Sequence, residues 1–205
     1  MRKLVYLFIG ILVLSTTTAC APPLEPQPLP TEQPESRPSQ KTVTDEWTQK
    51  QIPVKLFSLQ GFPFTTYFPE SDFIVDSGAS DEGLGVWFYS QVGGKKNELA
   101  YVHFFFPAKP TTLEAMKKEV TGKRGLMETN KWTVKGRSQD IPYRWAKERI
   151  DFERPLNAQN NIMGTVYIGE HNGKAFRVTE HFTADYGDGF APRSSILLKE
   201  LQLKD

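Results

Sequence analysis

Apolar and polar residues alternate along much of the chain after about residue 60, with the two-residue period of β-strands. Branched and aromatic residues fill the runs 62–68, 84–90 and 98–106. In the third run one face carries Tyr101, His103 and Phe105. The other face carries Val102, Phe104 and Phe106. These patterns predict three strands, with a turn at Gly93-Gly94 between the second and the third.

The period becomes helical after about residue 110. Four side chains would share one face of a helix: Leu113, Met116, Lys117 and Val120. Thr111 and Glu114 have the spacing of a capping box, in which the Thr111 hydroxyl accepts a free amide hydrogen and Glu114 reaches back. We predict a helix that runs to about Thr121 and is ended by Gly122 and Gly125.

Further strand patterns follow at 131–135, 143–152, 162–170 and 175–183. The last two are joined through Asn172-Gly173, the strongest short signal for a hairpin, because both residues tolerate the positive φ of a type I′ turn. The two-residue turn fixes the register. We expect Tyr167 to face Val178, and Met163 to face Phe182.

This register separates the two sides of the hairpin. We expect one side to be buried and the other to be polar, carrying Arg177, Thr179 and His181. After the hairpin, Pro192 suits the first turn of a final helix with Ile196, Leu197 and Leu201 as its apolar contacts. A short extended stretch is expected at 201–203.

The predicted order of elements favours an α+β fold. It consists of strands, a helix, antiparallel strands and a terminal helix. We expect a single antiparallel β-sheet flanked by helices, an α/β/α sandwich. Its aromatic residues, Trp87, Trp132, Trp145 and 104–106, exceed what a sheet open on one face needs to bury. An open face would form a surface for a protein or an apolar ligand. The alternative, which we favour, is that helices cover both faces.

The first 20 residues have the plan of an export signal. Arg2 and Lys3 precede a short apolar run at 4–14, and small residues at 15–19 lead to Cys20, the one cysteine of the chain. The placement of Cys20 resembles the lipobox of bacterial lipoproteins, although Thr17 stands where that family has an aliphatic residue. This resemblance implies a signal peptide at 1–19, and acyl chains (palmitate among them) on Cys20. It places the protein in the cell envelope, outside the cytoplasm and anchored to a membrane.

Composition changes sharply after Cys20. Seven of the 15 prolines fall in the next stretch: Pro22, Pro23, Pro26, Pro28, Pro30, Pro34 and Pro38. Such a segment lacks the apolar groups that would offset its ordering entropy, and it favours extended conformations. We therefore expect a tether at 20–44 and one globular domain at 45–205.

The charge balance disfavours nucleic acid as a partner. The chain has 25 basic and 24 acidic residues, so the form without Arg2 and Lys3 is close to neutral. Nucleic-acid binding domains carry a clearly basic face. A single cysteine, assigned to the lipid, also leaves the folded domain without an intramolecular disulfide.

The folded part resembles the PsbP-like family, named after an accessory protein of photosystem II. Four features between residues 61 and 203 carry the resemblance: a strand ending in Phe68-Pro69, a strand entering the helix through Phe106-Pro107, the Asn172-Gly173 hairpin, and a closing helix that leads to residues 198–201. The resemblance implies the sandwich fold described above. It also implies a non-enzymatic accessory role at a membrane-associated protein partner.

The densest acidic segment is 185–189, where Asp185 and Asp188 could offer oxygen ligands to Ca²⁺ or a small ligand. The segment lacks the remaining ligands of an EF-hand, and the favoured interpretation is a turn whose aspartates cap the final helix. Glu180 and His181 could extend such a site on the hairpin. His103 is expected to be a partly buried histidine with its hydrogen bonds satisfied, and His171 to be solvated.

No nucleophile elbow, phosphate-binding loop or zinc-ligand spacing occurs in the sequence, so we expect no metal and no cofactor. The leading hypothesis is a membrane-anchored, non-enzymatic binding protein of the cell envelope. The first alternative is a domain that binds Ca²⁺ or a small ligand. The second is a hydrolase assembled in space from residues such as His181, Glu180 and Ser195.

Overall fold

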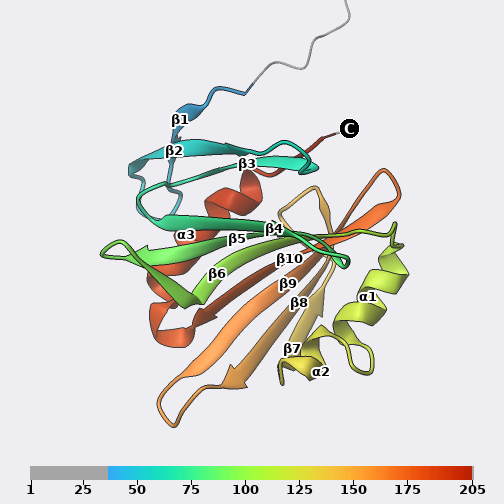
Figure 1. The fold of residues 1–205 in the computed structure, drawn as a ribbon. Coiled ribbons are helices and arrows are strands. Elements are labelled where there is room, and N and C mark those ends of the chain that lie inside the picture. The colour runs from blue at the N-terminus through green and yellow to red at the C-terminus, as the bar shows by residue number, and fades with distance from the viewer. Residues whose placement is uncertain (1–36, 205) are drawn as a thin grey trace, which may run out of the picture. The chain divides into compact units, whose positions relative to one another are not determined.

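The computed structural model describes residues 37–204, in which two antiparallel sheets and three helices form the fold (Figure 1). The large sheet has the strand order β4 (Phe73–Ala79), β5 (Gly83–Val92), β6 (Lys95–Pro107), β10 (Lys174–Thr183), β9 (Asn161–His171), β8 (Ala146–Pro155) and β7 (Thr133–Ser138). The small sheet has the order β1 (Gln40–Thr44), β2 (Gln51–Ser58), β3 (Phe64–Phe68) and β11 (Gln202–Leu203). The helices are α1 (Leu113–Thr121), α2 (Leu126–Thr129) and α3 (Gly187–Lys199), the last preceded by a 3₁₀ turn at Ala184–Tyr186.

Successive residues of β9 show how the two faces of the large sheet are covered, because they point in opposite directions. Val166 belongs to a buried cluster that includes Met116 of α1. Tyr167 belongs to the larger buried cluster, which includes Leu197 of α3 and Phe64 of β3. One face is therefore covered by α1 and α2, and the other by α3 together with the small sheet (Figure 1).

The α+β class is confirmed, but the single sheet was wrong. The strand at 62–68 does not join the other strands; as β3 it pairs with β2 and with β11 from the far end of the chain. The two-residue strand β11 is too short to show a two-residue period. The small sheet therefore depends on a pairing between Phe64 and Leu203 that no local pattern reveals.

The folded part also begins earlier than expected. The predicted tether at 20–44 includes β1, which pairs with β2 from Gln40↔Lys55 to Thr44↔Gln51. The compact unit starts at Arg37, whose guanidinium contacts Glu200 at 3.1 Å. The signal peptide, Cys20 and the tether up to residue 36 lie outside the described residues.

Two helix starts differ from the prediction. Thr112, not Thr111, caps α1, because its hydroxyl accepts the Ala115 amide hydrogen at 3.2 Å. Helix α3 begins at Gly187, so Pro192 lies inside it and does not open it. Phe190 stabilises this additional turn, since it is 1% exposed and packs between neighbouring aromatic rings.

The β9–β10 hairpin is confirmed in detail. Asn172 and Gly173 have φ values of 49° and 71°, as a type I′ turn requires. Tyr167 faces Val178, and Met163 faces Phe182. The prediction that one side of the hairpin is polar and exposed was wrong, because that side lies on the face of the large sheet covered by α1 and α2. Its three residues are buried or half-buried: Arg177, Thr179 and His181.

Candidate functional site

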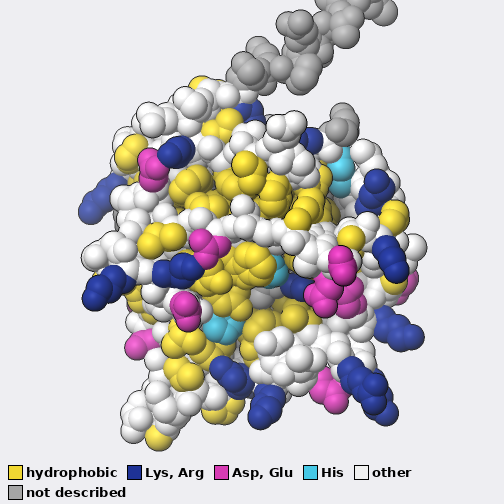
Figure 2. All heavy atoms as spheres, in the orientation of Figure 1, with side chains coloured by type: hydrophobic (Ala, Val, Ile, Leu, Met, Phe, Trp, Pro, Cys, Tyr) yellow, Lys and Arg dark blue, Asp and Glu magenta, His cyan; other side chains and the backbone are white. Residues whose placement is uncertain are grey.

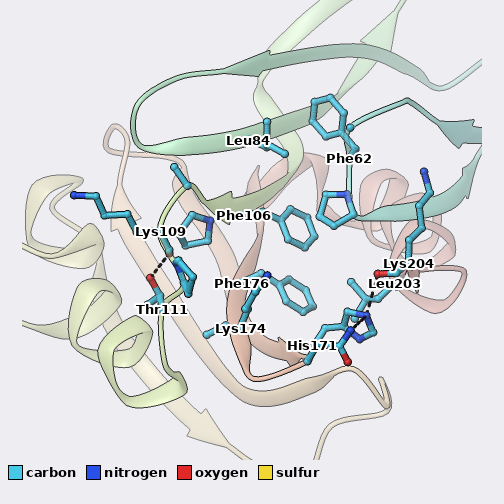
Figure 3. Close-up of a pocket in the computed structure, with 17 residues that line it drawn as sticks. Phe62, Leu84, Phe106, Lys109, Thr111, His171, Lys174, Phe176, Leu203 and Lys204 are labelled. Carbon is cyan, nitrogen blue, oxygen red and sulfur yellow. Dashed lines mark hydrogen bonds between the residues drawn. The ribbon is translucent and has the colours of Figure 1, made fainter.

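A pocket of about 470 Å³ lies between the two sheets, where β6 ends and β10 begins (Figure 3). It is defined here as the intersheet pocket and is lined by residues that include Phe62, Leu84, Phe106, Lys109, Phe176 and Lys204. Small-molecule sites in proteins have volumes of about 300–1,000 Å³. The pocket therefore has the size of a ligand site.

Stacked phenylalanine rings form the floor of the intersheet pocket. The rings of Phe106 and Phe176 lie 4.9 Å apart with 15° between their planes, and Phe64 stacks on Phe106 at 5.3 Å. Alternation along β6 directs Phe106 to the face that carries the small sheet. Leu84 and Phe62 line one side of the floor in Figure 3. The floor is thus continuous with the main hydrophobic core.

Backbone hydrogen bonds hold the walls of the pocket in place. The Ala175 amide donates to the Thr111 carbonyl at 2.7 Å, which joins the start of β10 to the segment before α1. The Lys204 amide donates to the Pro63 carbonyl at 2.9 Å, which extends the β3–β11 pairing along the opposite wall. Gly61 has a φ of 83° in the turn before β3, a conformation that favours glycine. The pocket is therefore preformed.

The charged residues that line the pocket are all basic. Lys109, Lys174 and Lys204 contribute to the lining, and no aspartate or glutamate of the described part of the chain does. Within residues 37–204 none of the three lysines forms an ion pair with a carboxylate; Lys204 Nζ contacts the Leu59 carbonyl at 3.4 Å. The mouth of the pocket therefore carries positive charge that the described part of the chain leaves unneutralised.

Two of the polar side chains in the pocket, Thr111 and His171, are engaged with the backbone, and Asn172 Nδ2 lies 3.2 Å from His171 Nε2. His171 Nε2 lies 3.0 Å from the Lys204 carbonyl, so His171 is half-buried and bonded, not solvated as expected. The Thr111 hydroxyl donates to the Lys109 carbonyl at 3.0 Å. The described lining contains no serine, cysteine or carboxylate to pair with His171 as a nucleophile or base. This arrangement suits binding.

The structure separates the sequence-predicted residues Glu180 and His181. Glu180 faces α3, where burial raises its pKa although the Ser194 and Tyr167 hydroxyls hydrogen-bond to it. His181 points to the other face of the large sheet, stacks on Tyr101 at 4.7 Å and contacts the Leu99 carbonyl through Nδ1 at 3.0 Å. Adjacent strand residues cannot share a site, because they lie on opposite faces.

Asp185 and Asp188 lie outside the intersheet pocket and do not cap α3. The cap residue of α3 is Tyr186, and it makes no side-chain capping hydrogen bond. Hydrogen bonds from the Thr183 and Asn160 side chains lower the pKa of Asp185, which belongs to the 3₁₀ turn. Asp188 is exposed in the first turn of α3. Within residues 37–204 no group of three or more acidic, histidine or cysteine side chains is placed to hold a metal ion.

Ser195, named with the hydrolase alternative, and its neighbour Ser194 are engaged inside α3. Ser194 donates to the Ala191 carbonyl at 3.1 Å, and Ser195 donates to the Pro192 carbonyl at 2.8 Å. His181 lies on the opposite face of the large sheet from this helix. The structure therefore does not bring these serines together with His181.

A second surface consists of aromatic side chains on the face of β5 and β6 that α1 and α2 leave uncovered (Figure 2). Trp87 and His103 stack there at 4.0 Å with 6° between their planes. Burial lowers the pKa of His103 to about 3, and the Arg177 charge acts in the same direction. His103 Nε2 has no hydrogen-bond partner in the described part of the chain, so it is not the satisfied histidine expected. The expectation that helices cover both faces was wrong for these strands.

A shallower hollow of about 340 Å³ lies over β1 and β2, and is defined here as the β1–β2 hollow. Its lining includes Lys41, Val54, Lys55 and Glu70. Lys55 forms an ion pair with Glu70, and Lys41 pairs with Glu200 at 2.8 Å. The charges around this hollow are therefore largely neutralised within the fold.

The comparisons with known proteins do not establish a family. No family model and no curated protein matches the chain. A crystal structure of a protein from Bacteroides thetaiotaomicron VPI-5482 aligns with a TM-score of 0.42 and 12% identity over 73% of this chain, which spans about half (48%) of that protein. The solution structure of cyanobacterial PsbP (CyanoP) from Synechocystis sp. PCC 6803 aligns with a TM-score of 0.46 and 10% identity, over 73% of this chain and 92% of that one. Separately, no helix among residues 37–204 has the length and apolar character needed to cross a membrane.

Proposed function

We propose that this chain is a lipid-anchored protein of the cell envelope that binds a membrane-associated partner through the intersheet pocket. The observation that carries the proposal is the composition of that pocket. It combines a floor of stacked phenylalanines with a rim of three lysines, and no carboxylate among residues 37–204 lines it. Its Thr111 and His171 side chains are engaged with the backbone, which favours binding over catalysis.

The sequence before residue 37 supports the membrane location. Cys20 follows a short apolar run and small residues, in the position that bacterial lipoproteins acylate. More than one acyl chain is needed for stable anchoring. The proline-rich segment that follows has the composition of a semi-rigid spacer. An anchor and a spacer of this kind would hold the pocket near the membrane surface.

Photo-crosslinking in the cells of origin tests both parts of the proposal. The full chain would carry p-benzoylphenylalanine in place of Lys109 at the rim of the pocket, or in place of Lys55 in the β1–β2 hollow as the matched control. We expect irradiation to give an adduct with a membrane component from position 109 and none from position 55. Cys20→Ser should move the chain from the membrane fraction to the soluble extracytoplasmic fraction and remove the adduct.

Two results would overturn the proposal. Equal adducts from positions 109 and 55, or none from either, would remove the pocket as the binding site. Retention of the Cys20→Ser chain in the membrane fraction would remove the lipid anchor. Circular dichroism of each variant would establish that the fold is unchanged.

A further inference from the structure

We propose that the intersheet pocket binds a single-chain amphiphile with an anionic head. The shared chemistry is an alkyl chain that ends in a carboxylate or a phosphate monoester. This assignment rests on the proposed function, because it names the class of ligand for the same pocket.

The floor of the pocket fits the alkyl chain. Phe106, which stacks on the buried ring of Phe176, presents an aromatic surface, and Phe62, Leu84 and Leu203 extend the apolar surface along the walls. Each buried methylene strengthens binding about fourfold, so affinity should rise steeply with chain length until the pocket is filled. Phe176 is 1% exposed and so supports Phe106 from behind, while the half-buried side chains of Phe62, Leu84 and Phe106 supply the surface that an alkyl chain would contact.

The rim fits an anionic head. Lys109 and Lys204 extend from opposite ends of the pocket in Figure 3, and Lys174 lies along the edge between them. The lysines are thus distributed around the mouth and not gathered at one point. Lysine acts as a flexible point charge and does not require the planar geometry that arginine matches. The same rim can thus accept a carboxylate or a phosphate.

The neutral polar groups argue against an uncharged polar ligand such as a sugar. The Thr111 hydroxyl donates to Lys109, and His171 Nε2 is engaged with the Lys204 carbonyl. A sugar would have to displace these contacts or leave its own hydroxyl groups unpaired, which is unfavourable in a partly dry site. The ammonium groups of Lys109 and Lys174, in contrast, make no hydrogen bond or ion pair within residues 37–204, and only Lys204 Nζ would have to leave the Leu59 carbonyl.

Calorimetric titration tests the assignment. The probes are decanoate, decyl phosphate, 1-decanol and hexanoate, titrated into the full chain carrying Cys20→Ser in buffer without detergent. The anionic probes are kept below their critical micelle concentrations and 1-decanol below its solubility limit. We expect one site per chain for decanoate and decyl phosphate. We expect at least about tenfold weaker binding of 1-decanol, which lacks the charge, and of hexanoate, which has a shorter chain. The ratio of the first two affinities distinguishes a fatty-acid ligand from a phosphate-headed lipid.

Variants locate the site. The double variant Lys109→Glu/Lys174→Glu should weaken decanoate at least about tenfold, because it reverses two of three rim charges. Leu84→Trp should abolish binding by filling the pocket. The matched control Lys55→Glu, in the β1–β2 hollow, should leave the affinity unchanged. Thermal unfolding of each variant would verify that the chain still folds.

Absence of heat with every probe, equal binding of decanoate and 1-decanol, or unchanged affinity in both pocket variants would overturn the assignment. These failures are distinguishable from failure of the proposed function. If decanoate does not bind but position 109 still gives adducts in cells, the pocket has a partner of another class. If decanoate binds while the adducts and the anchor are absent, the ligand assignment stands without the membrane role.

Discussion

The intersheet pocket and the β1–β2 hollow both contain lysines, but the two regions differ in whether carboxylates neutralise the lysine charges. In the hollow, Lys55 pairs with Glu70 and Lys41 pairs with Glu200, over a small aliphatic floor. In the pocket, lysines without carboxylate partners among residues 37–204 surround aromatic rings that belong to the main core. Cationic charge alone is therefore not our reason for proposing a ligand site. The proposal rests on unneutralised charge beside a preformed apolar surface.

The largest expected difference between the two regions is in the contribution of their floors to stability. Phe176→Ala should reduce the free energy of unfolding by about 3–5 kcal/mol, because it leaves a cavity in the main core. Val54→Ala, in the separate cluster behind the hollow, should reduce it by about 2 kcal/mol. Urea denaturation of both variants measures the difference. Equal losses would show that the pocket floor is not continuous with the core.

The next prediction separates the stability of the fold from the chemistry of the pocket. Burial raises the pKa of Glu180 above its ordinary value of 4.5, and Glu180 lines neither region. A carboxyl with a raised folded-state pKa stabilises the fold fully below its unfolded pKa, and this stabilisation is lost as pH rises through the folded pKa. The stability of the wild type should therefore fall, relative to Glu180→Gln, as pH increases above 4.5.

Urea midpoints of the wild type and Glu180→Gln at pH 4.5, 6 and 8 measure this effect. Decanoate affinity at a fixed pH should be the same in both proteins. Parallel stability profiles would contradict the enclosed position of Glu180. A changed affinity would show that the large sheet couples Glu180 to the pocket.

The smallest expected effect concerns the lysines themselves. Lys109→Ala should change the free energy of unfolding by less than about 0.5 kcal/mol, since this exposed side chain has no carboxylate partner among the described residues. Lys55→Ala should lower it by at most about 1 kcal/mol, the usual contribution of an exposed ion pair. Thermal unfolding at low salt checks both values. A marked loss for Lys109→Ala would mean that its charge serves the fold and is not available to a ligand.

Much of the large sheet was predictable from the sequence, because its signals are local. The Asn172-Gly173 turn fixed the register of β9 and β10, and alternation in β6 grouped Val102 with Phe104 on one face, which the structure shows to be the buried one. The small sheet was not predictable in this way. Its strands β1, β2 and β3 pair locally in chain order but carry weak patterns, and Gln202–Leu203 joins β3 only through long-range pairing that the folded chain brings about.

The candidate site was missed for the same reason. Phe62, Phe106, Phe176 and Lys204 come from four distant segments, and none belongs to a recognisable motif. The weak local signal was Lys109 in a proline-bounded stretch without acidic residues. Conversely, closeness in the sequence did not predict closeness of side chains in the fold. Glu180 and His181 are neighbours in the chain, yet they lie on opposite faces of one strand.

The central claim is that the intersheet pocket, and not the β1–β2 hollow, receives an anionic amphiphile. Nuclear Overhauser contacts between decanoate methylene protons and assigned side chains of the full Cys20→Ser chain test it most directly. The account predicts contacts to the ring protons of Phe62 and Phe106, and none to the methyl groups of Val54. Contacts to Val54, or their absence from both phenylalanine rings at saturating decanoate, would contradict it.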